Sequence, residues 1–242
     1  MTSISIKSDA KTISLTDGSE PYHDGPLRIV TDGLKGLGAV PPRENGIDIP
    51  QQDGTWWPSR LTSGGRTISI TGEAVGLSSI ETANLQDRIC DLMTRTLTII
   101  IQDAHGRRHM SGWIAQDPEP FMLMGEQIFT FTLIIYCPDP LKYGDPVTFI
   151  AAGGMLHVEN AGRSPSWPRL HADNVTSLSL TLKDRTILWT GSNTSLDLDL
   201  RDMIPSSGAV SGRAFKIPPG KSIIYVSANA SKVSMTVYPA WR

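Results

Sequence analysis

The sequence has few cysteines, no excess of charge of one sign and no long apolar run. Its 242 residues include only Cys90 and Cys137, too few for a disulfide framework. We expect free thiols in a protein made in a reducing compartment, with a single disulfide as the alternative. The formal net charge of −2 provides no broad basic field for nucleic acid or an anionic membrane.

Signals for membrane insertion and secretion are also lacking. The longest apolar runs, such as 133–136, are far too short to cross a bilayer. The first residues show no basic start followed by an apolar stretch, so no secretory signal is predicted. We therefore expect a soluble protein that does not follow the usual secretion route.

Turn-forming residues are abundant. The 22 Gly and 17 Pro, together with many Ser and Thr, favour a β-rich chain over a helix bundle. The strongest strand signal is 129–136, where aromatic residues alternate with Thr before a solid apolar run. A proline-rich stretch follows, in which the sheet must stop because proline lacks a backbone donor and restricts the residue before it. We predict an interdomain joint at Pro138, Asp139, Pro140, Tyr143 and Pro146.

The joint divides the chain into predicted domains 1–145 and 146–242. In the first domain, patterning predicts strands at 3–16 (two strands with a turn at 9–11), 26–30, 66–72, 97–101, 108–114, 121–124 and 129–136. One amphipathic helix is predicted at about 78–95, because Ser78 and Glu81 have capping-box spacing and apolar residues follow on one face.

The second domain is predicted to be all β. Short apolar-periodic segments recur between turn signals, and no helix is required. The segments are 147–150, 156–158, 177–182, 186–189, 195–200, 222–226 and 233–238. Their number and regular spacing predict an antiparallel sandwich or jelly roll.

A long stretch at about 31–65 is dense in Gly and Pro and has no firm periodicity. Such a stretch is either disordered or a functional loop system. Its apolar residues favour an ordered loop that packs against something, such as a neighbouring chain. These residues are Leu34, Leu37, Val40, Ile47, Ile49, Trp56 and Trp57.

Catalytic and metal-binding patterns are weak. Asp197 and Asp199 lie on one face of one strand, which favours a solvated face over a pair of catalytic carboxyls. His105 and His109 flank a hairpin without the further ligands that zinc needs. The glycines of 33–38 do not run from a buried strand into a helix, as a phosphate-binding loop requires. No catalytic residue, metal site or cofactor is predicted.

Several pieces occur in a characteristic order. They are the loop ending in 57–60, the strand 65–72, the single helix and hairpin, the exit 139–143, the segment His157-Val-Glu-Asn-Ala-Gly162, then Trp167-Pro-Arg-Leu170, and later 196–200 and 217–220. In this order and spacing the chain resembles the distal tail protein family of siphovirus-type bacteriophages and related prophages. The resemblance covers nearly the whole chain.

The resemblance implies a mainly β fold with a tail-tube-like N-terminal domain, a barrel or sandwich with one helix, and a galectin-like C-terminal jelly roll. It implies a structural, non-enzymatic role in the virion tail tip, assembled in the bacterial cytoplasm. A homo-hexameric ring would join the tail tube protein to the tail hub and leave a channel for DNA. In some relatives the second domain binds a host saccharide or a receptor-binding protein, which are further candidate partners.

Two other readings remain open. The chain could be a stand-alone carbohydrate- or receptor-binding module, with some of Trp56, Trp57, Trp113, Trp167, Trp189 and Trp241 stacking on sugars, although Trp in a sandwich is more often core. It could also be a β-sandwich hydrolase that uses Asp197 or Asp199. The long loop at 31–65 argues against a stand-alone binding module. The lack of a catalytic pattern argues against a hydrolase.

Overall fold

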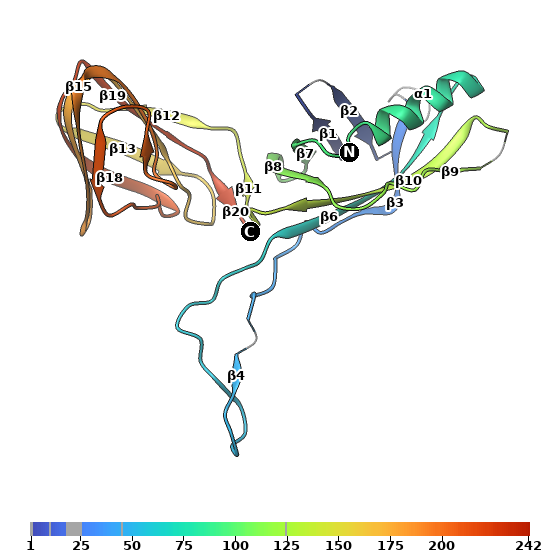
Figure 1. The fold of residues 1–242 in the computed structure, drawn as a ribbon, viewed down its shortest axis with the longest axis horizontal. Coiled ribbons are helices and arrows are strands. Elements are labelled where there is room, and N and C mark those ends of the chain that lie inside the picture. Colours follow the sequence, from blue (N-terminus) through green and yellow to red (C-terminus); the bar gives the residue numbers. More distant parts are fainter. Residues whose placement is uncertain (1, 10, 18–25, 45, 124) are drawn as a thin grey trace. The chain divides into compact units, whose positions relative to one another are not determined.

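The computed structural model describes residues 2–9, 11–17, 26–44, 46–123 and 125–242. The chain forms two compact units (Figure 1). Unit 1 comprises Met1–Lys142 with Arg242, and unit 2 comprises Tyr143–Trp241. No helix within the described part of the chain is long and apolar enough to cross a membrane.

Unit 1 is built on a closed barrel of seven strands. They are β1 (Ser3–Lys7), β2 (Thr12–Thr16), β3 (Leu27–Lys35), β6 (Arg66–Val75), β7 (Leu97–Asp103), β8 (Gly106–Ile114) and β10 (Ile128–Cys137). Their order is β8-β7-β1-β2-β3-β6-β10, and pairing of β10 with β8 closes the ring. Among these strands only β2 and β3 pair in parallel. A short strand, β9 (Phe121–Met122), adds to β10.

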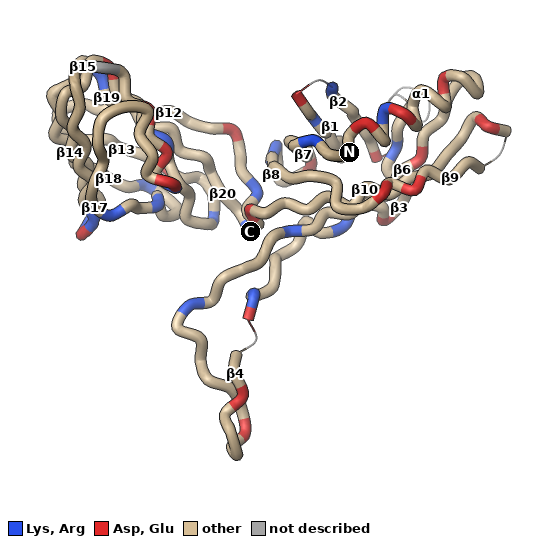
Figure 2. The backbone as a smooth tube through the Cα atoms, in the orientation of Figure 1, with Lys and Arg blue, Asp and Glu red and all other residues tan. Residues whose placement is uncertain are grey.

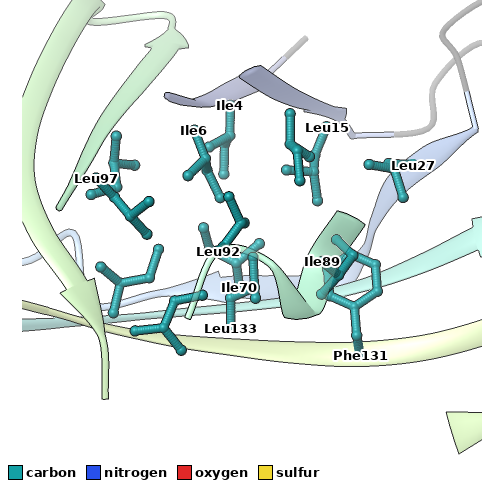
Figure 3. Close-up of a cluster of buried hydrophobic side chains, with 14 of the residues drawn as sticks. Ile4, Ile6, Leu15, Leu27, Ile70, Ile89, Leu92, Leu97, Phe131 and Leu133 are labelled. Atoms are coloured by element: carbon teal, nitrogen blue, oxygen red, sulfur yellow. The ribbon is translucent and has the colours of Figure 1, made fainter. Parts of the chain in front are cut away.

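The barrel interior is apolar because its strands alternate. Every second residue of β6 and of β10 is buried, as a period of two residues requires. Figure 3 shows Ile4 and Leu15 facing Ile70 and Leu133, with Ile89 of helix α1 (Ser79–Cys90) in the same cluster. The helix thus seals this core with its apolar face.

The helix begins as predicted and ends earlier. The Ser78 hydroxyl accepts a hydrogen bond from the Glu81 amide (3.2 Å), and the Glu81 carboxylate accepts from the Leu77 amide (2.8 Å). The predicted end near residue 95 is wrong, because the chain leaves the helix after Cys90. The Leu92 amide bonds to the Ile89 carbonyl three residues back, which tightens the chain into turns.

Both cysteines are free thiols. Cys137 is fully buried at the end of β10, and this burial raises its thiol pKa to about 11, opposed by the nearby Arg66 charge. Because the thiolate is the reactive form, Cys137 is inert at neutral pH.

Unit 2 is an antiparallel sandwich. Its strands are β12 (Val147–Ile150), β13 (Met155–Asn160), β14 (Arg169–Leu182), β15 (Arg185–Asp199), β16 (Ile204–Pro205), β17 (Ala209–Gly212), β18 (Gly220–Asn229) and β19 (Lys232–Val237). The long strands β14 and β15 serve both layers. Residues 169–173 of β14 pair with β19, and residues 177–181 pair with β18. Register shifts between Ala172 and Ser177 mark the change from one layer to the other.

The predicted strands at 186–189 and 195–200 are one strand, β15, which corrects the turn expected between them. The position of Gly191 has no room for a side chain, because a Cβ there would lie 2.3 Å from the Trp189 ring. That ring is 1% exposed, and its Nε1–H donates to the Ser207 carbonyl (2.7 Å). The predicted fold class is confirmed: a mainly β chain with a one-helix barrel unit and a β-sandwich.

Candidate assembly surface

A segment with several exposed large apolar side chains lies between β3 and β6. β3 extends to Lys35, so residues 31–35 belong to the barrel, and we define the arm as residues 36–65. The arm is a narrow two-stranded ribbon that leaves the barrel and turns back near its tip (Figure 1). Among its described residues, the paired strands are β4 (Ile47–Asp48) and β5 (Thr55–Trp56). A bridge between Pro42 and Ser63 adds one further contact between the two sides.

The arm exposes large apolar side chains. The exposed fractions are 76% for Ile47, 61% for Trp56, 88% for Trp57 and 57% for Leu61. Single exposed apolar residues are ordinary, but four on one narrow ribbon form an exposed apolar surface. Leu61 was missed from the sequence, where it stands alone between Arg60 and Thr62.

Two residues predicted to form the contact surface of the arm pack inward instead. Leu34 and Leu37 pack against the barrel core of their own chain. Leu34 lies within β3, which continues past the position where the sequence suggested a loop, and Leu37 follows two residues after the end of β3. Val40 and Ile49 are half-buried. The free apolar surface of the arm is therefore concentrated nearer its tip.

Arg66, the first residue of β6, anchors the base of the arm. It is 1% exposed, and its guanidinium donates to three carbonyls: Gly36 (2.5 Å) and Gly38 (2.6 Å) from Nη1 and Pro140 (3.0 Å) from Nε. Burial lowers the pKa of this guanidinium, although an arginine remains charged at neutral pH. A buried cation thus ties the start of the arm to the end of the barrel.

Lys142 makes a second contact of the same kind. Its ammonium donates to the Leu37 carbonyl (2.5 Å). Burial lowers its pKa, and the neighbouring charges of Arg66 and Arg108 lower it further. Leu37, Arg108 and Lys142 are among the residues that line a small cavity of about 250 Å³.

Glycines allow the arm to leave the barrel at a tight angle. Gly36 has a φ of +89°, and a Cβ there would lie 2.0 Å from the Thr67 carbonyl oxygen. At Gly65 a Cβ would lie 2.4 Å from the Tyr136 hydroxyl oxygen. Gly33 and Gly36 therefore serve close backbone packing, whereas Gly38 has open space where a Cβ would lie.

The predicted joint residues surround the division between the units. The Asp139 carboxylate accepts from the Leu141 amide (3.0 Å), and Pro140 supplies one of the carbonyls bound by Arg66. Within unit 2 the Tyr143 ring meets the Tyr238 ring edge-on, with centroids 6.5 Å apart. Pro138 follows directly after β10, and Pro146 is exposed. A mechanical role for these residues remains a prediction.

The two carboxylates of β15, Asp197 and Asp199, face basic side chains on the neighbouring strand β14. Asp199 accepts from Arg169 Nε (3.1 Å), and Asp197 lies 2.7 Å from His171 Nδ1. Asp173 lies 3.1 Å from the other ring nitrogen of His171. The pair is therefore part of a solvated ladder of cross-strand ion pairs.

We predict that this ladder makes unit 2 sensitive to pH. Hydrogen bonds to Asp197 and Asp173 raise the pKa of His171 above 6.5. The stabilisation is therefore fully present below about 6.5 and is lost as pH rises through the folded-state pKa. In an NMR titration, Asp197→Asn should lower the His171 pKa, and Asp184→Asn at an exposed turn should leave it unchanged. An unchanged pKa in Asp197→Asn would refute the assignment.

The other residues considered as metal or sugar ligands in the sequence do not form a metal site among the described residues. Within the described ranges, no three His, Cys, Asp or Glu side chains are grouped to hold a metal ion. The His105 amide donates to Asp103 in the β7–β8 turn, and His109 lies within β8. In unit 2, Trp189 is buried and Lys216 lies over the Trp167 ring (4.9 Å).

Comparisons with known proteins identify solved structures that share this fold. No family model matches the sequence, and no curated protein matches it. The Dit (gp 19.1) protein of phage SPP1, described as a paradigm of hub adsorption apparatus in phages infecting Gram-positive bacteria, superposes with a TM-score of 0.70 at 14% identity, over 99% of both chains. Chains of the activated phage P2 baseplate with calcium or strontium give TM-scores of 0.58 and 0.54, each at 11% identity over 98% of both chains. The chain therefore has the fold expected from its sequence resemblance.

Proposed function

We propose that this protein is a structural component of a phage tail tip, where it forms a hexameric ring that joins the tail tube to the baseplate hub. The end-to-end similarity to the Dit protein of phage SPP1, over 99% of both chains, carries this proposal. The similarity spans both units, so the two domains occur together in the same order in both proteins. The ring would leave a central channel for DNA.

The chemistry of the chain agrees with a non-enzymatic role. The only carboxylate pair singled out in the sequence is held by Arg169 and His171. A net charge of −2 suits a channel through which DNA passes without being gripped, because strong phosphate binding needs many basic contacts. We place the protein in the virion, with the tail tube protein and the tail hub as partners. We assign residues 1–145 to the ring and 146–242 to the sandwich.

The arm is the proposed contact between neighbouring ring subunits. A ring requires heterologous contacts, in which one patch of each subunit meets a different patch of the next. The exposed Trp56 and Trp57 are residue types that dominate the energy of such contacts. A carbohydrate-binding role is less favoured, because Trp189 is buried and Lys216 covers Trp167, so neither indole offers a bare stacking face.

The proposal is tested by the mass of the purified protein in solution. Light scattering should give six times the chain mass of 26.3 kDa, and negative-stain images should show rings with a central hole. A protein that stays monomeric at high concentration, alone and with its tail partners, would overturn the ring. A trimer would instead favour a receptor-binding module.

A further inference from the structure

A second exposed apolar patch lies on unit 1, on residues that no role described above uses. It consists of Leu77, Ile80, Phe121 and Leu123, with exposed fractions of 90%, 75%, 67% and 48%. We call these four residues the end patch. They match the arm in kind and number, since the arm also exposes four large apolar side chains.

Backbone pairing gathers the end patch at one end of three adjacent strands. The Gly76 amide bonds to the Gln127 carbonyl, which joins the end of β6 to the start of β10. The Leu123 amide bonds to the Ile128 carbonyl, which joins the β9 segment to β10. Since neighbouring strands lie about 4.8 Å apart, Leu77 and Leu123 are within about two strand spacings sideways.

The end patch and the arm lie at opposite ends of the same strand. β6 starts at Arg66, at the base of the arm, and ends at Val75, two residues before Leu77. Ten extended residues span about 30 Å. The arm also projects away from the barrel (Figure 1), so it does not cover the end patch of its own chain.

Charges near the two surfaces are complementary over part of the arm. Glu73, Glu81, Glu119 and Glu126 lie in the segments that carry or adjoin the end patch, where Glu73 lies 4.0 Å from Arg28. The part of the arm between the tryptophans and the barrel carries Arg43 and Arg60 together with Glu44, and the Arg43 amide bonds to the Thr62 carbonyl. Figure 2 shows acidic residues around the ends of α1, β6 and β9; on the arm it shows basic residues between the tip and the barrel and further acidic residues toward the tip.

We propose that the end patch is the docking site for the arm of a second copy of this chain. Trp56, Trp57 and Leu61 of one copy cover Leu77 and Ile80 of the next, with Arg43 and Arg60 facing the glutamates. This inference rests on the proposed ring and specifies which surface receives the arm. The contact is heterologous, so every subunit gives one arm and receives another.

The test uses one variant for each side of the contact. The arm variant is Trp56→Ser with Trp57→Ser, and the patch variant is Leu77→Asp with Ile80→Asp. Neither should unfold the protein, because all four side chains are exposed. Acidic residues at the start of α1 are favourable for the helix. The matched control is Ile150→Asp with Tyr225→Asp, which changes two exposed residues of unit 2.

Light scattering should show that each variant loses the ring and falls about sixfold in mass, whereas the control keeps it. An equimolar mixture of the two variants should form dimers and nothing larger. The intact arm of the patch variant can bind the intact end patch of the arm variant, and no further competent pair remains. A patch variant that still forms rings, or a mixture that stays monomeric, would overturn the inference.

Crosslinking separates failure of the inference from failure of the proposed ring. In a Cys90→Ser background, chains carrying Trp57→Cys are mixed with chains carrying Leu77→Cys and are oxidised at high concentration. Disulfide dimers between the two kinds of chain support the contact even if wild-type rings never close. Rings that form without this crosslink would leave the proposed function intact and refute the end patch as the docking site.

Discussion

Replacing Gly36 by alanine is expected to destabilise unit 1 by about 3 kcal/mol. The new methyl group would lie 2.0 Å from the Thr67 carbonyl oxygen, at a residue whose φ of +89° already disfavours a side chain. The clash is with backbone, so no side-chain rotation relieves it. β3 must then move away from β6, and the ladder that begins the arm is disrupted.

The matched control is Gly38→Ala, two residues further along. No atom lies within 4 Å of a Cβ built there, so the substitution should change the unfolding free energy by less than about 0.5 kcal/mol. Urea unfolding followed by tryptophan fluorescence and far-UV circular dichroism measures both variants. Equal unfolding free energies would show that the close approach at Gly36 does not constrain the barrel.

Replacing Arg66 by methionine is expected to cost about 3 kcal/mol and to loosen the arm. Methionine keeps an unbranched apolar stem in the buried site but offers no donor to the carbonyls of Gly36, Gly38 and Pro140. Each carbonyl that is left buried without a partner costs about 1 kcal/mol or more. The loss exceeds the gain from not burying a charge, because three acceptors depend on one side chain.

Two measurements check this expectation. Urea unfolding gives the loss of stability, and limited proteolysis should cut within 36–65 faster in Arg66→Met than in the wild type. Arg213→Met is the matched control, since Arg213 is exposed on unit 2, outside the arm, and should alter neither readout. Arm cleavage at the wild-type rate in Arg66→Met would mean that the other base contacts suffice to hold the arm.

Local pattern was enough to predict most strands. β6 and β10 alternate cleanly along their sequences, and the structure pairs them over ten residues each. The start of the helix was also readable, because a capping box is a spacing within a few residues. Its end was not, since Leu92 keeps the apolar period while lying in a turn and is still buried.

Features that depend on residues far apart along the chain could not be predicted from the sequence. Arg66 looks like the first residue of an alternating strand, and its carbonyl partners are 28, 30 and 74 residues away along the chain. Gly191 looks like a turn signal, yet its role is to make room for the Trp189 ring within a continuous strand. Leu34 was assigned to the arm because nothing local reveals how far β3 extends, and nothing local reveals that Leu37, just beyond β3, packs against the barrel core.

The closed base of the arm also makes its tip a natural place for insertions. The tip turn is held by two backbone bonds, from Ile49 to Gly54 and from Gln52 to Ile49, and Gly54 has open space around it. Because both ends of the ribbon are pinned at the barrel, extra residues at the tip add only loop entropy, about 0.6 kcal/mol for each doubling of length. A peptide tag placed between residues 51 and 54 should therefore leave the barrel folded and give a handle on the arm.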